Sequence, residues 1–135
     1  MITSKVKYLG DLRTSAMHVA SGTTIITDAP IDNHGKGEAF SPTDLVATSY
    51  ASCMLTIIGI YCNTHDLKFI NGSSEVTKLM SANAPRRIEK LLITIDISGN
   101  GWDENQIKHV IAAAKACPVA KTLGENVEVE LTINV

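Results

Sequence analysis

Three cysteines, Cys53, Cys62 and Cys117, are the residues of this sequence with the most distinctive chemistry. The thiolate form of cysteine is a nucleophile and a redox-active group. Three cysteines in 135 residues form an odd and sparse set, unlike the disulfide framework of a small secreted protein. We therefore expect reduced thiols, each of which is either reactive or simply buried in the core.

The local settings of the cysteines differ. Cys117 directly precedes Pro118 at an expected helix N-terminus, where free N–H groups stabilise a thiolate, so local physics makes Cys117 the more acidic candidate. Cys53 falls in the middle of an expected long helix and would need a nearby cation, because the helix dipole fades within about one turn. Cys62 follows nine residues later, about half a turn around the helix, so we expect it on the opposite face as a space-filling residue.

The composition excludes several classes of protein. Apolar residues make up 44% of the chain and charged residues 19%, which is enough for a folded core and excludes a disordered chain. The 12 basic and 14 acidic residues give a net charge of −2, so we expect no nucleic-acid partner. The four histidines show no metal-ligand spacing with one another or with the cysteines, so we expect no metal site.

The distribution of apolar residues predicts where the protein works. Residues 1–10 contain no apolar run and no small-residue cleavage site, so we expect a cytoplasmic protein. Residues 45–64 carry no formal charge and are long enough to span a bilayer. Six of them are serine, threonine or asparagine and no basic residues flank them, so we expect a buried core helix and no membrane partner.

The rest of the chain predicts the elements that position the thiols. Alternating and β-branched residues with turn signals between them predict three antiparallel strands in the first thirty residues. A pair of strands is expected over residues 66–81 and 85–98, and a last strand over residues 127–135. With the helices described next, the order βββ-α-ββ-αα-β predicts a single α+β domain over residues 1–135.

Two helix starts are clearly marked. Ser41 is a good N-cap, Pro42 fits the first helical position and Asp44 completes a capping box, which predicts a helix that ends near residue 64. Asp103 caps a second helix, with Gln106 at the box position. A short third helix follows the Cys-Pro pair, so the first and third helices carry the two cysteines of most interest.

Four motifs give the chain its resemblance to a known family: Asp28-Ala29-Pro30, Ser41-Pro42-Thr43-Asp44-Leu45, Ala51-Ser52-Cys53 and Cys117-Pro118-Val119-Ala120. With them the chain resembles the OsmC/Ohr family, the osmotically inducible and organic hydroperoxide resistance proteins, and in particular its broad OsmC-like branch. The resemblance covers essentially the whole chain. It implies the OsmC-like α+β fold with a long buried central helix, in an intertwined homodimer whose sites lie at the interface.

The same resemblance implies a thiol-dependent peroxidase that reduces organic hydroperoxides in oxidative-stress defence without a cofactor. Cys53 matches the peroxidatic cysteine of the family and Cys117 the resolving cysteine. Arg13, the only arginine before Arg86, matches the activating arginine. The peroxidatic thiolate would become a sulfenic acid, the resolving thiol would condense with it, and an external dithiol would reduce the disulfide.

One position departs from the Ohr-type pattern. Those members carry a glutamate one residue after the helix-start proline, where it pairs with the arginine, and this chain has Thr43 there. Glu38 in the preceding loop and Asp44 are the candidate carboxylate substitutes, with Asp44 also expected in the capping box. Two alternatives to a peroxidase stay open: an OsmC-like protein that binds a small ligand without catalysis, and a thiol redox sensor.

Overall fold

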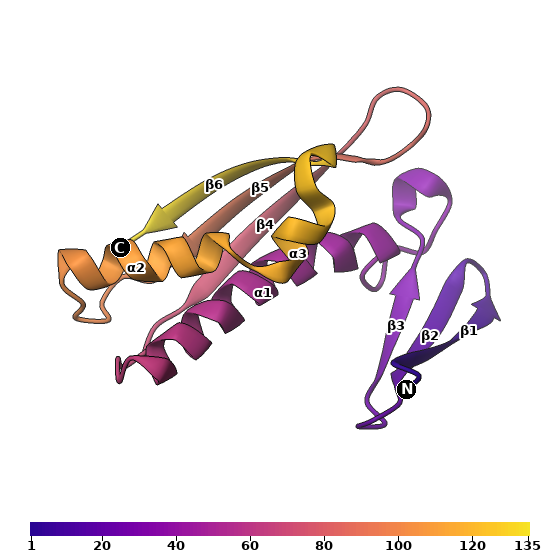
Figure 1. The fold of residues 1–135 in the computed structure, drawn as a ribbon. Coiled ribbons are helices and arrows are strands. Elements are labelled where there is room, and N and C mark those ends of the chain that lie inside the picture. The colour runs from indigo at the N-terminus through magenta and orange to yellow at the C-terminus, as the bar shows by residue number, and fades with distance from the viewer. The chain divides into compact units, whose positions relative to one another are not determined.

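The computed structural model describes all 135 residues, and the chain divides into two compact units, Met1–Val46 and Ala47–Val135 (Figure 1). The element order is β1-β2-β3-α1-β4-β5-α2-α3-β6, with short 3-10 turns at Ile31–Asn33 and Gly124–Asn126. This order confirms the predicted α+β class and the predicted succession of strands and helices. That the chain acts as one domain stays a prediction.

The first unit contains a three-stranded antiparallel sheet whose strands are β1 (Ser4–Gly10), β2 (Arg13–His18) and β3 (Thr24–Asp28). Asp11 and Leu12 both have positive φ, so the chain turns tightly from β1 into β2. Val6, Ala16 and Ile25 are aligned across the three strands on one face. Val6 and Ile25 are exposed, so this apolar face is not covered in the single chain.

Residues 29–40 form a loop that returns to the end of β3. The backbone N–H of Asp28 donates to the carbonyl of Phe40 at 3.1 Å, which ties the two ends of the loop together. Gly35 is required for this closure, because a Cβ there would lie 1.7 Å from the carbonyl oxygen of Ala29. The closed loop keeps the residues just before Phe40 beside the end of β3.

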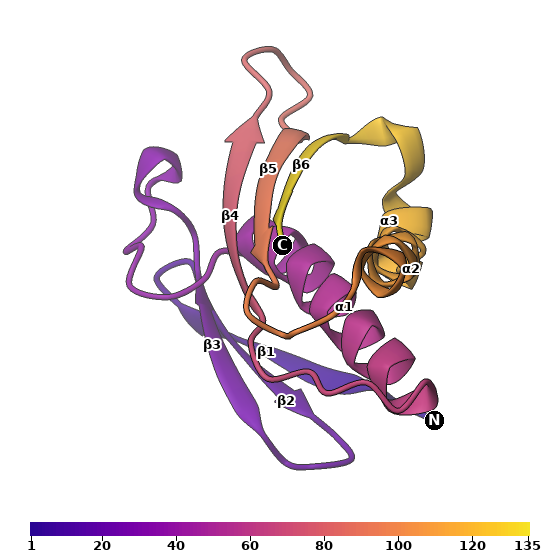
Figure 2. The same cartoon turned by 90° about the vertical axis from the view of Figure 1, so that its left-hand side faces the viewer.

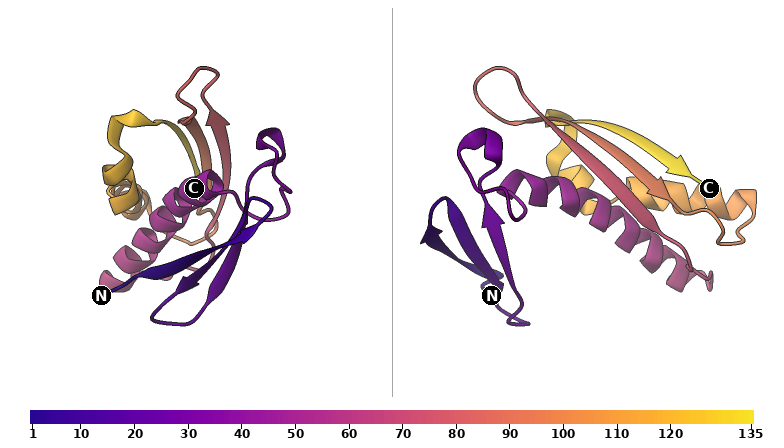
Figure 3. Two further views of the ribbon diagram at one scale, coloured as in Figure 1. Left: turned by 90° about the vertical axis from the view of Figure 1, so that its right-hand side faces the viewer. Right: turned by 180° about the vertical axis from the view of Figure 1, so that it is seen from behind.

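The second unit contains a sheet in the order β4-β5-β6 with helices on one face (Figures 2 and 3). Its elements are β4 (Ser73–Met80), β5 (Ile88–Asp96), α2 (Glu104–Lys115), α3 (Pro118–Leu123) and β6 (Glu128–Asn134). β4 and β5 are antiparallel, whereas β5 and β6 are parallel because α2 and α3 connect them as a crossover. Helix α1 (Pro42–Thr64) begins in the first unit and continues into the second.

The core of the second unit lies between this sheet and the helices. On β5, Leu91, Ile93 and Ile95 are buried while the residues between them are partly exposed, as the two-residue period predicts. The helix α2 adds Val110 and Ala114. The helix α1 contributes one stripe to this core, made by Ala47, Ala51, Met54, Ile58 and Cys62. Only one face of α1 is therefore buried in the single chain.

The first of the two expected middle strands starts later than predicted. Residues 66–72 form a loop, and β4 begins at Ser73. Trp102 Nε1 donates to the carbonyl of Lys68 at 2.9 Å, and the amide oxygen of Asn100 accepts the backbone N–H of Ile70 at 2.7 Å. Side chains from the segment before α2 thus satisfy backbone groups of this loop in place of a strand partner.

The start of α1 is as predicted. The carboxylate of Asp44 accepts the backbone N–H of Ser41 at 2.9 Å, and the N–H of Asp44 donates to the Ser41 hydroxyl at 3.1 Å, which completes the capping box. By length and composition alone α1 could cross a membrane, a test that the core helix of a soluble protein also passes. That the protein has no membrane partner stays a prediction.

Candidate functional site

Two of the three cysteines meet in the second unit. Cys53 lies on α1 and is partly exposed, whereas Cys117 is the fully buried residue that caps α3. Both thiols are free, and they lie close enough together for Cys53 to raise the pKa of the Cys117 thiol. The fold therefore joins an accessible thiol to a protected one. Their roles in a reaction stay a prediction.

The local sequence explains the placement of Cys117. Pro118 occupies the first position of α3, where its missing N–H costs no hydrogen bond. Cys117 has an extended backbone, with φ −62° and ψ 140°, and its sulfur accepts the N–H of Ala120 at 3.3 Å. The thiol thus takes the place that serine or aspartate usually fills as an N-cap.

Burial raises the pKa of the Cys117 thiol, the hydrogen bond from Ala120 lowers it, and the adjacent Cys53 thiol raises it again. The net direction is upward. The expectation that the start of α3 would lower the pKa of the Cys117 thiol is therefore wrong, because it took the helix start into account but not the complete burial of the side chain. Cys53 is the thiol that is both accessible and close to a second sulfur.

Tyr50 belongs to the surroundings of the pair, although no sequence motif marks it. It precedes Cys53 by three residues on α1, and burial together with the neighbouring Cys117 raises the pKa of its hydroxyl. Residues three positions apart on a helix lie on the same face, so this spacing could have identified Tyr50 as a neighbour of Cys53 from the sequence. Cys62 is fully buried on α1 and burial raises the pKa of its thiol, as expected for a residue that fills space.

Arg13 lies in the first unit, as the first residue of β2. Its Nε and Nη2 groups donate to the two carboxylate oxygens of Asp28 at 2.7 and 2.9 Å. Nη2 also donates to Oε2 of Glu38 at 2.9 Å. These hydrogen bonds raise the pKa of the guanidinium further above its usual value, so it is charged throughout the working pH range.

The two carboxylates around Arg13 differ in exposure. The side chain of Asp28 is fully buried, and its hydrogen bonds with Arg13 lower the pKa of the carboxyl group in spite of burial. The side chain of Glu38 is 67% exposed. Of the two candidate substitutes for the family glutamate, Glu38 contacts the arginine and Asp44 forms the cap of α1.

In the sequence, Asp28 stands out only as part of the Asp28-Ala29-Pro30 motif, which predicts no role for its carboxylate. The register of the first sheet places it directly opposite Arg13, at the end of β3. A cross-strand pair of opposite charges at the ends of two expected strands was the signal that could have found it.

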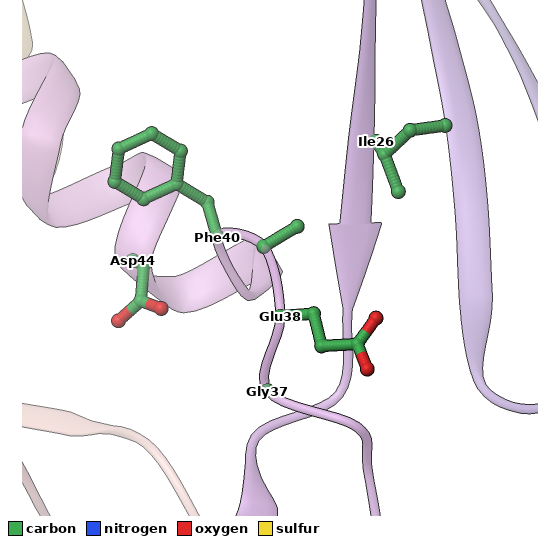
Figure 4. A pocket seen from close by; sticks show the side chains of 6 residues that line it. Ile26, Gly37, Glu38, Phe40 and Asp44 are labelled. Carbon is green, nitrogen blue, oxygen red and sulfur yellow. The ribbon is translucent and has the colours of Figure 1, made fainter.

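A surface hollow of about 420 Å³ lies beside this group in the first unit (Figure 4). It is lined by Ile26, Gly37, Glu38, Ala39, Phe40 and Asp44. Figure 4 shows Phe40 and Asp44 on the α1 side of the loop, and Ile26 and Glu38 toward β3. The lining combines apolar groups with two carboxylates and includes no cationic side chain, so the hollow suits an uncharged apolar group better than an anionic one.

No cluster of metal ligands accompanies these groups. Nowhere in residues 1–135 do three or more histidine, cysteine, aspartate or glutamate side chains lie together so that they could hold a metal ion. That the protein needs no cofactor stays a prediction.

Comparison with known proteins places the chain in a family. The model of the OsmC-like protein family matches residues 35–132. A protein of Psychrobacter arcticus, described as a candidate osmotic stress induced and detoxification response protein, is 50% identical to this chain. The two structures superpose with a TM-score of 0.91 over 99% of this chain and 96% of that one. Among curated protein sequences, none matches this chain.

Two more distant structures share the fold. The organic hydroperoxide resistance protein OsmC of Legionella pneumophila is 21% identical, with a TM-score of 0.77 over 100% of this chain and 98% of that one. The organic hydroperoxide resistance protein OhrB of Bacillus subtilis is 17% identical, with a TM-score of 0.68 over 98% of both chains. At these identities the likeness concerns the fold alone. The family model and the 50% identical relative show that this chain belongs to the OsmC/Ohr family of OsmC-like proteins.

Proposed function

We propose that this protein is a thiol-dependent peroxidase that reduces organic hydroperoxides. The observation that carries the proposal is the proximity of a partly exposed thiol, Cys53, to a buried thiol, Cys117. A reversible two-electron oxidation needs two such sulfurs within bonding reach. Membership of a family with members named for hydroperoxide resistance supports the choice of substrate.

The reaction has two chemical steps before the enzyme is reset. The thiolate of Cys53 attacks the distal oxygen of the hydroperoxide, the O–O bond breaks, and the leaving alkoxide takes up a proton to become an alcohol. Cys53 is then a sulfenic acid. Cys117 loses its proton and attacks this sulfur, which forms the disulfide and releases water. An external dithiol supplies two electrons and two protons through thiol–disulfide exchange, and both thiols are restored.

Arg13 is the cation that we assign to the reaction. Cys53 lies far from either end of α1, so the helix dipole does little to stabilise its thiolate. A guanidinium would stabilise both this thiolate and the negative charge that develops on the leaving oxygen. The assignment rests on the family resemblance of Arg13, and the pairing with Asp28 and Glu38 supports it because it keeps the guanidinium charged and ordered.

We further propose that the protein works as a homodimer in the cytoplasm. The first unit exposes Val6, Tyr8 and Ile25, and the side chain of Ile60 on α1 is 55% exposed. Apolar surface of this extent is a typical site of association. Light scattering after gel filtration would give twice the chain mass for a dimer, and the mass of one chain would refute this part of the proposal.

Peroxide consumption with disulfide mapping tests the reaction. The reduced protein should consume cumene hydroperoxide repeatedly in the presence of dithiothreitol and form a Cys53–Cys117 disulfide in its absence. Cys53→Ser should abolish both the consumption of peroxide and the formation of the disulfide. Cys117→Ser should keep the first oxidation, detected by a sulfenic-acid probe, and lose the internal disulfide. Cys62→Ala, which changes a thiol outside the pair, should behave like the unchanged protein.

Other outcomes favour the two alternatives. Oxidation that stops after one equivalent of peroxide, with no recycling by any dithiol, would indicate a redox sensor. The absence of both peroxide consumption and the Cys53–Cys117 disulfide would overturn the peroxidase and leave a ligand-binding protein. A ligand whose affinity is unaffected by Cys53→Ser would then support that function.

A further inference from the structure

The hydrogen bonds of Arg13 engage one side of its guanidinium only. Asp28 takes the Nε–H and one Nη2–H in a bidentate pair, at 2.7 and 2.9 Å, and Glu38 takes the other Nη2–H at 2.9 Å. A guanidinium carries five N–H groups in a rigid plane. The two N–H groups that neither carboxylate takes are both on Nη1. The guanidinium is therefore oriented with a single two-donor edge left for a ligand.

Asp28 determines this orientation more strongly than Glu38 does. The Asp28 side chain is fully buried, so water does not compete for its oxygens, whereas the Glu38 side chain is 67% exposed. Asp28 is itself immobilised, because it ends β3 opposite Arg13 and its Oδ2 also accepts the backbone N–H of Glu38 at 3.1 Å. A bidentate contact with an immobile carboxylate fixes both the position and the plane of the guanidinium.

The same group has little long-range cationic character. One guanidinium and two carboxylates sum to a charge of −1, and the nearby Lys36 is paired with Asp11 at 4.0 Å, so the field of this cluster at a distance does not attract anions. What remains is short-range and directional, namely the two N–H donors of Nη1. A lysine ammonium at this position would keep the charge but could not reproduce the bidentate geometry.

We propose that Asp28 is the positioning residue of Arg13, and that it presents the Nη1 edge to the oxygen atoms of the substrate. This inference rests on the proposed peroxidase function and deepens it. As the O–O bond breaks, negative charge develops on the leaving oxygen, and donors aimed there in advance stabilise it without reorganisation. Asp28 thereby fills the positioning task at the site where Thr43 supplies no carboxylate. Glu38 contributes a smaller, solvent-screened share.

Three substitutions test the proposal. Asp28→Asn should lower kcat about 100-fold with little change in KM, as expected when a reacting group is misplaced by about 1 Å. Glu38→Gln should lower kcat by less than about 5-fold, because an exposed ion pair contributes little. Arg13→Lys should lose as much activity as Asp28→Asn, since charge without the planar geometry does not suffice.

A control variant separates this effect from the loss of any hydrogen-bonded carboxylate at the end of a strand. Asp96 ends β5 and accepts two hydrogen bonds from Ser98, at 2.9 and 2.6 Å, and hydrogen bonding likewise lowers the pKa of its carboxyl group. Asp96→Asn should leave kcat unchanged. An equal loss of kcat in the Asp28 and Asp96 variants would overturn the proposal, as would a Glu38→Gln variant that loses more activity than Asp28→Asn.

A spectroscopic measurement gives an answer that does not depend on turnover. The Nε–H of Arg13 should give a slowly exchanging proton–nitrogen NMR signal in the unchanged protein and in Glu38→Gln, and this signal should be lost in Asp28→Asn. If the protein consumes no peroxide, the proposed function fails. The positioning role is tested separately by the NMR signal, and a signal retained in Asp28→Asn would overturn it. If Asp28→Asn does not fold, Arg13→Lys decides, because full activity in that variant would refute a positioning requirement.

Discussion

Removing the sulfur of Cys117 separates its structural task from its chemical one. Cys117→Ala removes the acceptor of the Ala120 N–H and leaves a void where a fully buried sulfur was. Loss of a helix N-cap costs about 1 kcal/mol. Loss of one buried group of methyl size costs about 1 kcal/mol more. The free energy of unfolding should therefore fall by about 2 kcal/mol in Cys117→Ala.

Cys117→Ser should behave differently in the same assay. Serine is a better N-cap than cysteine and keeps an acceptor for Ala120, but its hydroxyl gains less from burial than a thiol does. We expect its stability to lie within about 1 kcal/mol of the unchanged protein. Urea unfolding of the reduced proteins, followed by circular dichroism, measures these differences.

A third variant calibrates the result. Cys62 is equally buried and caps no helix, so Cys62→Ala should lose the burial contribution only, about 1 kcal/mol. The difference between Cys117→Ala and Cys62→Ala then measures the cap. The reasoning would be refuted if Cys117→Ala were as stable as the unchanged protein, or if Cys117→Ser were the least stable of the three. Both Cys117 variants should still fail to form a disulfide with Cys53, whatever their stability.

Further outcomes follow from exposure, charge and capping. Iodoacetamide should label Cys53 well before Cys62 in the folded, reduced protein, because Cys62 is buried. Mass spectrometry of early time points measures this difference, and equal labelling of the two thiols would contradict it. Because Arg13 lowers the pKa of Asp28, their pair stabilises the fold above the usual aspartate pKa near ~4, and this contribution is lost as the pH falls through the lowered value. Acid unfolding of Asp28→Asn should accordingly be less steep below about pH 4, and an unchanged profile would contradict the pairing. Asp103→Ala removes the capping box of α2 and should cost about 1 kcal/mol in urea unfolding, whereas no measurable change would show that the cap is not formed in solution.

Local patterns in the sequence correctly predict the element order and the helix starts. The capping boxes at Ser41 and Asp103 depend on residues within one helical turn, and the structure confirms both. The predicted start of the middle strand at residue 66 is wrong, because the structure of this segment depends on residues far away in the chain. The backbone of residues 66–72 is satisfied by side chains around Asn100 and Trp102, some thirty positions away, and no local pattern reports such partners.

Acidity shows the same division between local and distant causes. The sequence around Cys117 predicts an N-cap correctly, and from that cap alone a lowered pKa would follow. Burial reverses the direction, because it is set by strands and helices from other parts of the chain. The proximity of Cys53, which lies far earlier in the chain, likewise depends on the packing of the second unit.

The sequence by itself determined the α+β class, the helix starts and the motifs that assign the chain to its family, since each depends on neighbouring residues. The tertiary structure decided which thiol is accessible and which carboxylate holds Arg13. A charge is stabilised or penalised by every group within a few ångströms, wherever in the chain that group comes from. Asp28 gains its position from the cross-strand register of the first sheet and its partner Glu38 from a loop closed at Gly35, and the motif around Asp28 contains neither piece of information.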